Sequence, residues 1–366
     1  MRERLILRNL KLTDEQAVDI AVEEGIIAAI SKPWSGHGNV EYDGTGLYVS
    51  SGWIDLHVHA FPELDPYGDE IDEIGVRQGV VTIVDAGSCG ADRIAELAAS
   101  GSRARTNLLA FLNISSIGLS RIDELSDLAW IDAKKTIQAA RQHPDFIVGL
   151  KARISRSVVG DNGIEPLRLA RSLSDATELP IMVHIGSGPP DIEDIVPLLR
   201  KRDIITHYLN GKKNNLFDAE GSPLPVLTDA IRRDVRLDVG HGTASFSFAV
   251  AEAAKRHGIA PDTISSDIYR GNRLKGPVYS LANVMTKFLA LGYPLGEVVA
   301  AVTVRAAEWL GKPALGRIHE GEAANLTLFK VADRSASLVD SEGAERIADK
   351  WIEPKGVVVN GAFMSC

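Results

Sequence analysis

Residues 52–59 read Gly-Trp-Ile-Asp-Leu-His-Val-His, an apolar run that ends in two histidines separated by one valine. A short apolar run of this kind indicates a buried strand. Alternate residues of a strand point to the same side, so His57 and His59 are placed to bind one metal ion. A single His-x-His pair is as often packed or solvated as ligating, and its interpretation depends on the other polar residues that end buried runs.

Four more short apolar runs along the chain each end in one polar side chain. These end residues are Lys151, His184, His207 and Asp267. A buried strand that finishes in a single polar residue places that group where the strand leaves the core, which is where an α/β barrel assembles its active site. We therefore expect five strands to bring these residues and the His-x-His pair to one place.

The spacing of strand-like segments predicts a closed parallel barrel. Candidate strands begin near Trp53, Val80, Asn107, Ile147, Pro180, Ile204, Arg236 and Thr263. Most intervals between them contain a helix-like segment, such as residues 128–143 and 246–257. Eight strands that alternate with helices are typical of a (β/α)8, or TIM, barrel of the α/β class, which we assign to residues 51–315.

Both ends of the chain have the pattern of short strands. The expected strands are residues 5–12, 17–22, 26–30, 325–329 and 356–361. Because the two sets flank the predicted barrel, we expect them to pair with each other. The sequence thus predicts a small β-sandwich domain built from residues 1–50 and 316–366 together.

Composition and charge exclude several classes of function. The 366 residues are 45% hydrophobic and 24% charged, an ordinary globular composition, and the formal net charge of -9 disfavours nucleic acid or an anionic membrane as partner. The two cysteines, Cys89 and Cys366, match no disulfide or metal-binding pattern, which favours a reducing compartment. Early charges interrupt any signal-peptide core and no apolar run has membrane-spanning length, so a cytoplasmic protein is expected.

The order of the six polar residues resembles the amidohydrolase superfamily. Members carry His-x-His after the first barrel strand, Lys after the fourth, His after the fifth and sixth, and Asp after the eighth, and this chain has a match at every position. The resemblance covers the barrel from His57 to Asp267, and family members commonly add a small β domain from both termini. The strand-4 lysine is most similar to the binuclear branch that contains dihydroorotases and hydantoinases.

The resemblance implies a binuclear metal centre. Lys151 would be carboxylated on its side-chain nitrogen (N6) and would bridge two divalent ions, for which zinc is the default with imidazole and oxygen ligands. The implied ligands are His57, His59 and Asp267 for one ion and His184 and His207 for the other. A bound metal lowers the pKa of water from about 15.7 toward ~7. The family mechanism would then be attack by a metal-bridging hydroxide, with Asp267 as general base and afterwards general acid.

Positive charge and polar side chains gather next to the predicted ligands. The candidate substrate-binding residues are Arg153, Arg156, Asn113, His241, Tyr269 and Arg270. Because arginine binds carboxylates in bidentate pairs, we expect a small anionic substrate. The alternative for each arginine is an ion pair with a nearby acid. The sequence leaves the oligomeric state open, a homo-oligomer included.

Residues 149–155, Gly-Leu-Lys-Ala-Arg-Ile-Ser, are similar to a dihydroorotase-like subgroup with Gly-x-Lys-x-Arg-x-Ser after strand 4. That subgroup is suited to acyl esters or amides of small α-substituted carboxylic acids. Typical dihydroorotases carry an arginine two residues after the second histidine, where this chain has Phe61. The resemblance therefore implies a metal-dependent hydrolase that cleaves an acyl ester or N-acyl amide bond beside a carboxylate.

Two alternatives stay open at this point. One is a cyclic amidase of the dihydroorotase or hydantoinase type, which would open a ring to one product where acyl removal yields two. The other is a non-catalytic hydantoinase-like assembly protein, although relatives of that kind have lost the ligands that this chain keeps. A deaminase is disfavoured, since that branch generally uses one metal ion and no strand-4 lysine.

Overall fold

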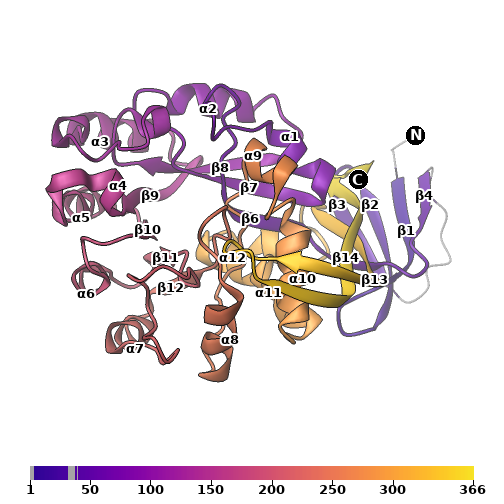
Figure 1. Ribbon diagram of the computed structural model, residues 1–366. Helices are drawn as coiled ribbons and strands as arrows, with labels where there is room; N and C mark the ends of the chain where they lie inside the picture. The colour runs from indigo at the N-terminus through magenta and orange to yellow at the C-terminus, as the bar shows by residue number, and fades with distance from the viewer. Residues whose placement is uncertain (1–3, 32–37, 39) are drawn as a thin grey trace.

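The computed structural model describes residues 4–31, 38 and 40–366, and these residues form two sheets (Figure 1). One is a seven-stranded parallel sheet whose strands follow one another in chain order. Its strands are β6 (Trp53–Val58), β7 (Val80–Ala86), β8 (Asn107–Asn113), β9 (Ile147–Ile154), β10 (Ile181–Ile185), β11 (Ile204–Thr206) and β12 (Arg236–Asp238). The strands predicted to begin from Trp53 to Arg236 are therefore confirmed.

Residues 263–268 close the barrel between β12 and β6. Isolated parallel bridges join Thr263 to Asp238 and Ile268 to Val58. The sequence predicts a regular eighth strand here, but Asp267 has a φ of 51°, outside the strand region, and the regular ladder is broken. With this irregular eighth segment, the predicted (β/α)8 barrel is confirmed.

Helices cover the outside of the barrel (Figure 1). The longer helices are α2 (Ile94–Gly101), α3 (Ala133–Gln142), α5 (Glu165–Thr177), α7 (Pro225–Arg232), α8 (Phe248–Arg256), α10 (Leu281–Ala290) and α11 (Leu295–Ala301). The shorter helices are α1 (Ile71–Ile74), α4 (Arg156–Val159), α6 (Ile192–Ile195), α9 (Arg270–Lys275) and α12 (Val304–Trp309). The 3-10 turns are η1 (Val76–Gln78), η2 (Gly118–Ser120), η3 (Leu128–Trp130), η4 (Gly160–Asn162), η5 (Val196–Leu198) and η6 (Pro313–Gly316). Among the described residues, no helix has the length and apolar character needed to cross a bilayer.

The helix predicted over residues 128–143 begins later than expected. Residues 128–130 form the turn η3, and α3 starts after Asp132. The carboxylate of Asp132 accepts a hydrogen bond from the amide of Lys135 at 3.1 Å. Such a cap satisfies an amide that has no partner inside the helix, which explains why the helix starts there. The other predicted helix, over residues 246–257, agrees closely with α8.

An apolar cluster fills the end of the barrel where the strands begin. Ala306 and Trp309 of α12 belong to it together with Ile54, Leu56 and Phe111 of the barrel strands. Burial of this apolar surface keeps water out of that end. The six predicted ligands lie at or just beyond the opposite ends of the strands.

The second sheet has eight strands and combines both ends of the chain. Its order is β15-β14-β13-β5-β1-β2-β3, with β4 paired to β1. The strands are β1 (Arg4–Lys11), β2 (Ala17–Glu23), β3 (Ile26–Ser31), β4 (Val40–Asp43), β5 (Tyr48–Ser51), β13 (Leu326–Val339), β14 (Glu345–Val359) and β15 (Ala362–Ser365). Ser50 lies opposite Thr327 in the antiparallel pair β5–β13, which joins the two ends. The predicted pairing of the termini is confirmed, while the domain limits 1–50 and 316–366 stay a prediction.

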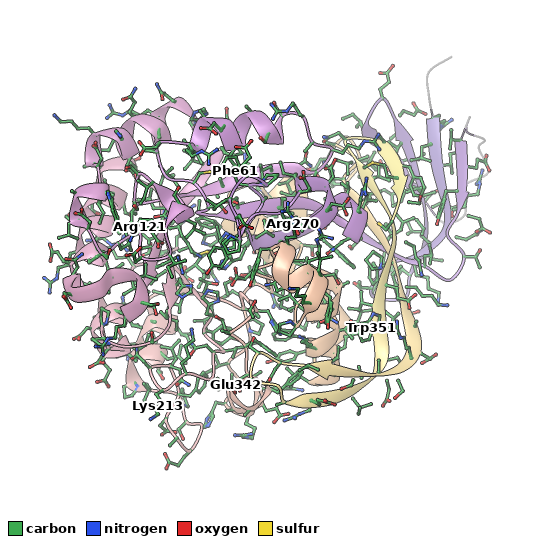
Figure 2. The ribbon with its side chains drawn as sticks, turned by 45° about the horizontal axis from the view of Figure 1, so that its top comes forward. Phe61, Arg121, Lys213, Arg270, Glu342 and Trp351 are labelled. Carbon is green, nitrogen blue, oxygen red and sulfur yellow. The ribbon has the colours of Figure 1, made fainter. Side chains whose placement is uncertain are left out.

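The β13–β14 hairpin extends from this sheet along the barrel (Figures 1 and 2). Figure 2 labels Trp351 on the hairpin and Glu342 at its far end. The amide of Ile352 donates to the hydroxyl of Thr286 in α10 at 3.1 Å, so the hairpin is bound to the barrel's helices. The sequence predicts only the inner parts of these strands, because their outer parts are rich in charged residues and carry no continuous apolar run. We call the far turn, residues 340–344, the hairpin tip.

Candidate active site

The six predicted ligands lie at the end of the barrel where the strands finish. Five of them line a pocket of about 280 Å³; these are His57, His59, Lys151, His184 and Asp267. The sixth, His207, is fully buried with its ring centroid 4.3 Å from that of His184. A closed parallel barrel brings all its strand ends to one rim, and the residues meet for this reason.

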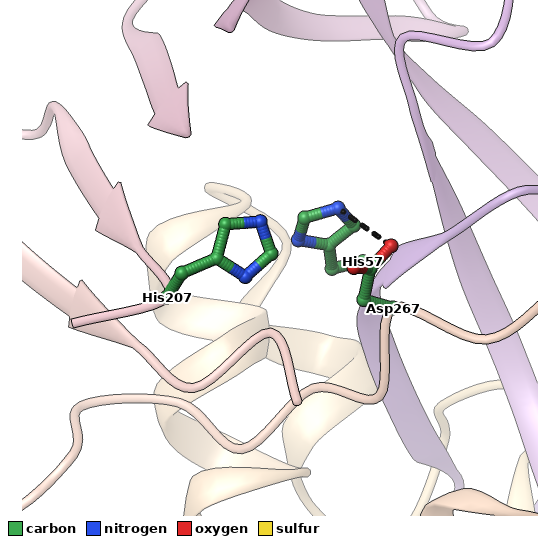
Figure 3. Close-up of side chains that lie close together, drawn as sticks. All are labelled: His57, His207 and Asp267. Atoms are coloured by element: carbon green, nitrogen blue, oxygen red, sulfur yellow. Dashed lines mark ion pairs between the residues drawn. The ribbon is translucent and has the colours of Figure 1, made fainter. Parts of the chain in front are cut away.

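His57 and His59 flank the carboxylate of Asp267. Oδ1 of Asp267 lies 3.3 Å from Nε2 of His57 and 3.1 Å from Nε2 of His59. Figure 3 shows the first of these contacts. Nδ1 of His59 faces the hydroxyl of Ser88 at 2.9 Å, so its Nε2 is the nitrogen that faces the site. The two histidines present nitrogen atoms to one point, in line with their spacing on the strand.

Further hydrogen bonds fix the rings of His57 and His207. Nδ1 of His57 lies 3.0 Å from the hydroxyl of Thr206, which itself donates to Asp238 at 2.8 Å. The hydroxyl oxygen therefore accepts from Nδ1–H, and Nε2 of His57 keeps its lone pair. Nδ1 of His207 likewise donates to the carbonyl of Gly240 at 2.6 Å. Contacts of this kind set which nitrogen can bind a metal.

Lys151 is fully buried within this group. Its Nζ lies 3.2 Å from Nε2 of His57 and 3.2 Å from the sulfur of Met182. In the part of the chain that the structure describes, no carboxylate forms an ion pair with it. Burial lowers the pKa of this amine to about 7, because the ammonium loses its hydration. The site thus holds a lysine that gives up its proton easily.

The protonation states of the group suit metal binding. Burial lowers the pKa of His207 to about 3 and those of His57 and His184 well below the usual value, so the imidazoles are neutral at pH 7. Nε2 of His207 lies 2.8 Å from Nδ1 of His184. Burial alone would raise the pKa of Asp267, but the hydrogen bond from His59 and nearby positive charge hold it below its usual range. The carboxylate is therefore ionised.

The donor set fits a divalent metal ion. Ligand atoms of His57, His207 and Asp267 all lie within 4.8 Å of one another (Figure 3). Imidazole nitrogen and carboxylate oxygen are the ligands that zinc and related ions take in proteins. This group has members from both subsites implied by the family resemblance, so the two subsites adjoin each other.

Two of the predicted substrate contacts line the pocket, namely Arg153 and Tyr269. Nη1 of Arg153 lies 3.0 Å from Oε2 of the buried Glu124, so part of the guanidinium is already paired. The hydroxyl of Tyr269 lies 3.0 Å from that of Thr243, which also lines the pocket. Both residues are placed to contact a bound ligand.

The other four predicted contacts do not line this pocket. Arg156 and Arg270 are exposed, outside the pocket lining. Asn113 is buried and donates to a main-chain carbonyl at 3.0 Å. His241 is buried too, with Nε2 2.7 Å from Nζ of Lys287. Their positions lend no support to direct contact with a ligand.

The pocket wall also contains residues that sequence reasoning missed. Lys212, in the loop after β11, lines it together with Tyr67, in the loop after β6. Lys212 forms no ion pair within the described residues, and partial burial lowers its pKa. Both residues lie several positions beyond a strand end, where the fold of the loop decides which side chains face inward. Positive charge in a rim loop was the only sequence signal that could have marked Lys212.

Comparisons with known proteins agree with this geometry. Residues 318–364 match a family model described as the deacetylase-like composite domain. A deacetylase of Enterococcus faecalis is 41% identical over 360 residues, which cover 98% of each chain. A solved structure titled as an adenine deaminase is 40% identical, with a TM-score of 0.96 and 100% of each chain covered. A second, titled as a dihydroorotase, is 31% identical, with a TM-score of 0.92 and 99% of each chain covered.

A barrel whose strand ends bring four imidazoles, a buried lysine and a carboxylate to one rim, three of the imidazoles in the wall of one pocket, defines a metal-dependent hydrolase of amide or acyl bonds. The chain belongs to the amidohydrolase superfamily, in its dihydroorotase- and hydantoinase-like branch, and has a deacetylase as a full-length relative. The names of the three relatives differ in substrate, so they leave the substrate to be argued from the pocket.

Proposed function

We propose that this enzyme removes the acyl group from an ester or amide of a small α-substituted carboxylic acid. The observation that carries the proposal is the presence of two cations, Arg153 and Lys212, on the wall of the pocket that holds the ligand group. Arg153 shares one nitrogen with Glu124, and Lys212 has no carboxylate partner among the described residues. A substrate carboxylate would pair with these two cations, while the acyl group faces Asp267.

The proposed cofactor is a pair of divalent ions, with zinc as the expected metal. The residues that would hold them are His57, His59 and Asp267 for one ion and His184 and His207 for the other, with Lys151, carboxylated on Nζ, between the two. Full burial beside an imidazole and a thioether fits this modification, because reaction with carbon dioxide needs an uncharged amine. When bound, such ions lower the pKa of water and polarise the acyl carbonyl.

Asp267 is placed to move the proton of the attacking water. Its Oδ1 lies 3.3 Å from Nε2 of His57 and 3.1 Å from Nε2 of His59, on the side of the ligand group, which leaves Oδ2 to accept that proton. A Cβ at Gly242 would clash with Oδ2, so glycine at this position keeps the oxygen accessible. We assign to Asp267 the uptake of the water proton and its delivery to the oxygen or nitrogen that leaves the acyl carbon.

The second candidate is a cyclic amidase, because Arg153 and Lys212 could equally hold a cyclic substrate that bears a carboxylate. Phe61 occupies the position of the arginine that typical dihydroorotases use for this purpose. Its side chain is buried, its ring lies 4.4 Å from the guanidinium carbon of Arg93, and it does not line the pocket. This position therefore has no side chain that could bind the substrate carboxylate, which favours acyl removal over dihydroorotase activity.

The test is a screen of metal-loaded protein against acyl esters, N-acyl D- and L-amino acids and cyclic imides, with product analysis. Acyl removal yields two products and ring opening yields one. We expect two products and turnover that depends on a carboxylate in the substrate. Ring opening as the sole activity would overturn the proposal in favour of a cyclic amidase. Far less than one equivalent of bound divalent metal, even after metal supplementation, would favour the non-catalytic assembly role.

A further inference from the structure

The hairpin tip, residues 340–344, is bound to the loop that joins β12 to α8. We call residues 241–248, which are most of that loop and the first residue of α8, the rim loop. The amide of Ser341 donates to the carbonyl of Phe246 at 3.0 Å, and its hydroxyl donates to the carbonyl of Gly242 at 3.1 Å. The carboxylate of Asp340 accepts from the amide of Phe248 at 2.9 Å. Main-chain groups along the rim loop are thus satisfied by residues from the far end of the chain.

A buried lysine of α10 also binds the same loop. Lys287 of α10 is fully buried, and its Nζ donates to Nε2 of His241 at 2.7 Å, to the carbonyl of Pro277 at 2.9 Å and to that of Val339 at 2.7 Å. Nδ1 of His241 donates to the carbonyl of Gly242 at 2.8 Å, which leaves Nε2 free to accept. Three acceptors match the three N–H groups of one ammonium. Lys287 therefore ties α10, the rim loop and the hairpin together.

The inner side of the rim loop faces the catalytic group. Thr243, Ala244 and Ser245 line the pocket. Gly242 lies against Asp267 so closely that a Cβ would clash with Oδ2. A shift of the rim loop would therefore change the space around the oxygen that we assign to proton transfer.

The hairpin tip also touches the loop that carries Lys212. A Cβ at Gly211 would overlap the carboxylate of Glu342, so these two residues are packed together. Figure 2 shows Glu342 near Lys213, on the same side of the molecule. The rim loop and the loop that carries Lys212 form two walls of the pocket, and both contact the hairpin tip.

We infer that the hairpin tip positions the catalytic rim, with Ser341 and Lys287 as positioning residues for the rim loop and, through Gly242, for Asp267. The inference rests on the role proposed above for Asp267. It connects the small terminal sheet to catalysis, because the tip joins two strands of that sheet, β13 and β14, while Asp267 belongs to the barrel. Small displacements of reacting groups are enough to slow catalysis strongly. Contacts that hold the rim loop in place should therefore affect the catalytic rate directly.

The test compares Ser341→Ala with Ser337→Ala, which removes from the same hairpin a hydroxyl that donates to the exposed Glu345. We expect Ser341→Ala to lower kcat by about tenfold with KM within about twofold, and Ser337→Ala to leave both unchanged. Amide hydrogen exchange over residues 241–248, read by mass spectrometry, should rise in Ser341→Ala alone. Ser341→Thr, which keeps the hydroxyl, should restore kcat and exchange protection.

The exchange measurement needs no substrate, and kcat is measured on whichever acyl or cyclic compound the protein turns over. Failure of the acyl-removal proposal would therefore leave this test intact. A Ser341→Ala protein with wild-type exchange in the rim loop and wild-type kcat would overturn the inference. So would a loss of thermal stability with kcat unchanged well below the melting temperature, since that is the result of a purely structural contact. Lys287→Met is the second variant. In the same measurements, it should raise amide exchange over the same loop.

Discussion

At the scale of single residues, Lys212 and Asp267 are the two pocket residues to which we assign different roles, substrate binding and proton transfer. Lys212 supplies positive charge on the wall, and Asp267 supplies a carboxylate between two histidines. In the function proposed above, Lys212 would contact the part of the substrate that does not react, and Asp267 would act at the bond that breaks. Substitutions at the two positions should therefore affect different kinetic constants.

Replacement of Lys212 by Met should raise KM for an anionic substrate by about tenfold or more, since a hydrogen bond to a charged group contributes about 1.5–3 kcal/mol. We expect kcat to change little, because the wall contact is the same in the ground state and the transition state. Steady-state kinetics of Lys212→Met beside Lys213→Met, the exposed neighbour, measure this difference. Equal effects of the two substitutions would contradict the assignment of Lys212.

Replacement of Asp267 by Asn removes the proton acceptor while nearly preserving its shape. We expect kcat to fall by about 10²–10⁴, the usual contribution of a general acid–base group. Circular dichroism should show an unchanged fold, which separates loss of chemistry from loss of structure. Turnover at the wild-type rate in Asp267→Asn would remove the residue from the mechanism.

At the scale of elements, a buried ion pair fastens α9 to the loop after β6. The carboxylate of Asp69 is fully buried and accepts from Nε and Nη2 of Arg273 at 2.6 and 2.9 Å. On the same two segments, Tyr67 and Tyr269 line the pocket with their ring centroids 5.5 Å apart in edge-to-face packing. The ion pair therefore fixes the relative position of two loops that form one pocket wall.

Replacement of Asp69 by Asn should lower the free energy of unfolding by about 3 kcal/mol, because it leaves a largely buried guanidinium without its counter-charge. Glu73→Gln is the matched control, since Glu73 lies 3.9 Å from Arg273 and is partly exposed, and we expect a change below about 1 kcal/mol. Denaturant unfolding followed by fluorescence gives both values. Equal stability of the two variants would show that the pair between Asp69 and Arg273 contributes no more to the free energy of unfolding than the partly exposed contact of Glu73.

For the whole molecule, the ligand group links parts of the barrel that are far apart in the sequence. Its members come from β6, β9, β10, the turn after β11 and the closing segment 263–268. Metal bound across these elements would hold the rim of the barrel together. A ligand that binds only the folded state stabilises it, and the stabilisation grows with the logarithm of the ratio of ligand concentration to Kd.

Removal of metal with a chelator should abolish activity and lower the melting temperature, and zinc should restore both. At a metal concentration of about 100 Kd the stabilisation is about 2.7 kcal/mol per site. Differential scanning calorimetry with and without zinc measures the shift, and His207→Ala is expected to reduce it. A melting temperature that responds to neither chelator nor zinc would rule out a metal centre in this group.

Much of the fold followed from local patterns in the chain. Each ligand ends a hydrophobic run, as His184 ends residues 181–183, and runs of this kind become strands wherever a core covers them. The prediction was less accurate where a local feature overrides the pattern. Capping by Asp132 delays the start of α3, and the positive φ of Asp267 interrupts the eighth strand.

The order of residues was enough to predict which side chains meet in the ligand group, because a parallel barrel gathers every strand end at one rim. The residues that shape the rest of the pocket became visible only in the folded chain. Lys212, Tyr67 and Ser341 lie in loops and turns, and no local pattern says which way a loop side chain faces. Their positions depend on contacts between segments separated by tens to hundreds of residues, such as that of the hairpin tip with the rim loop.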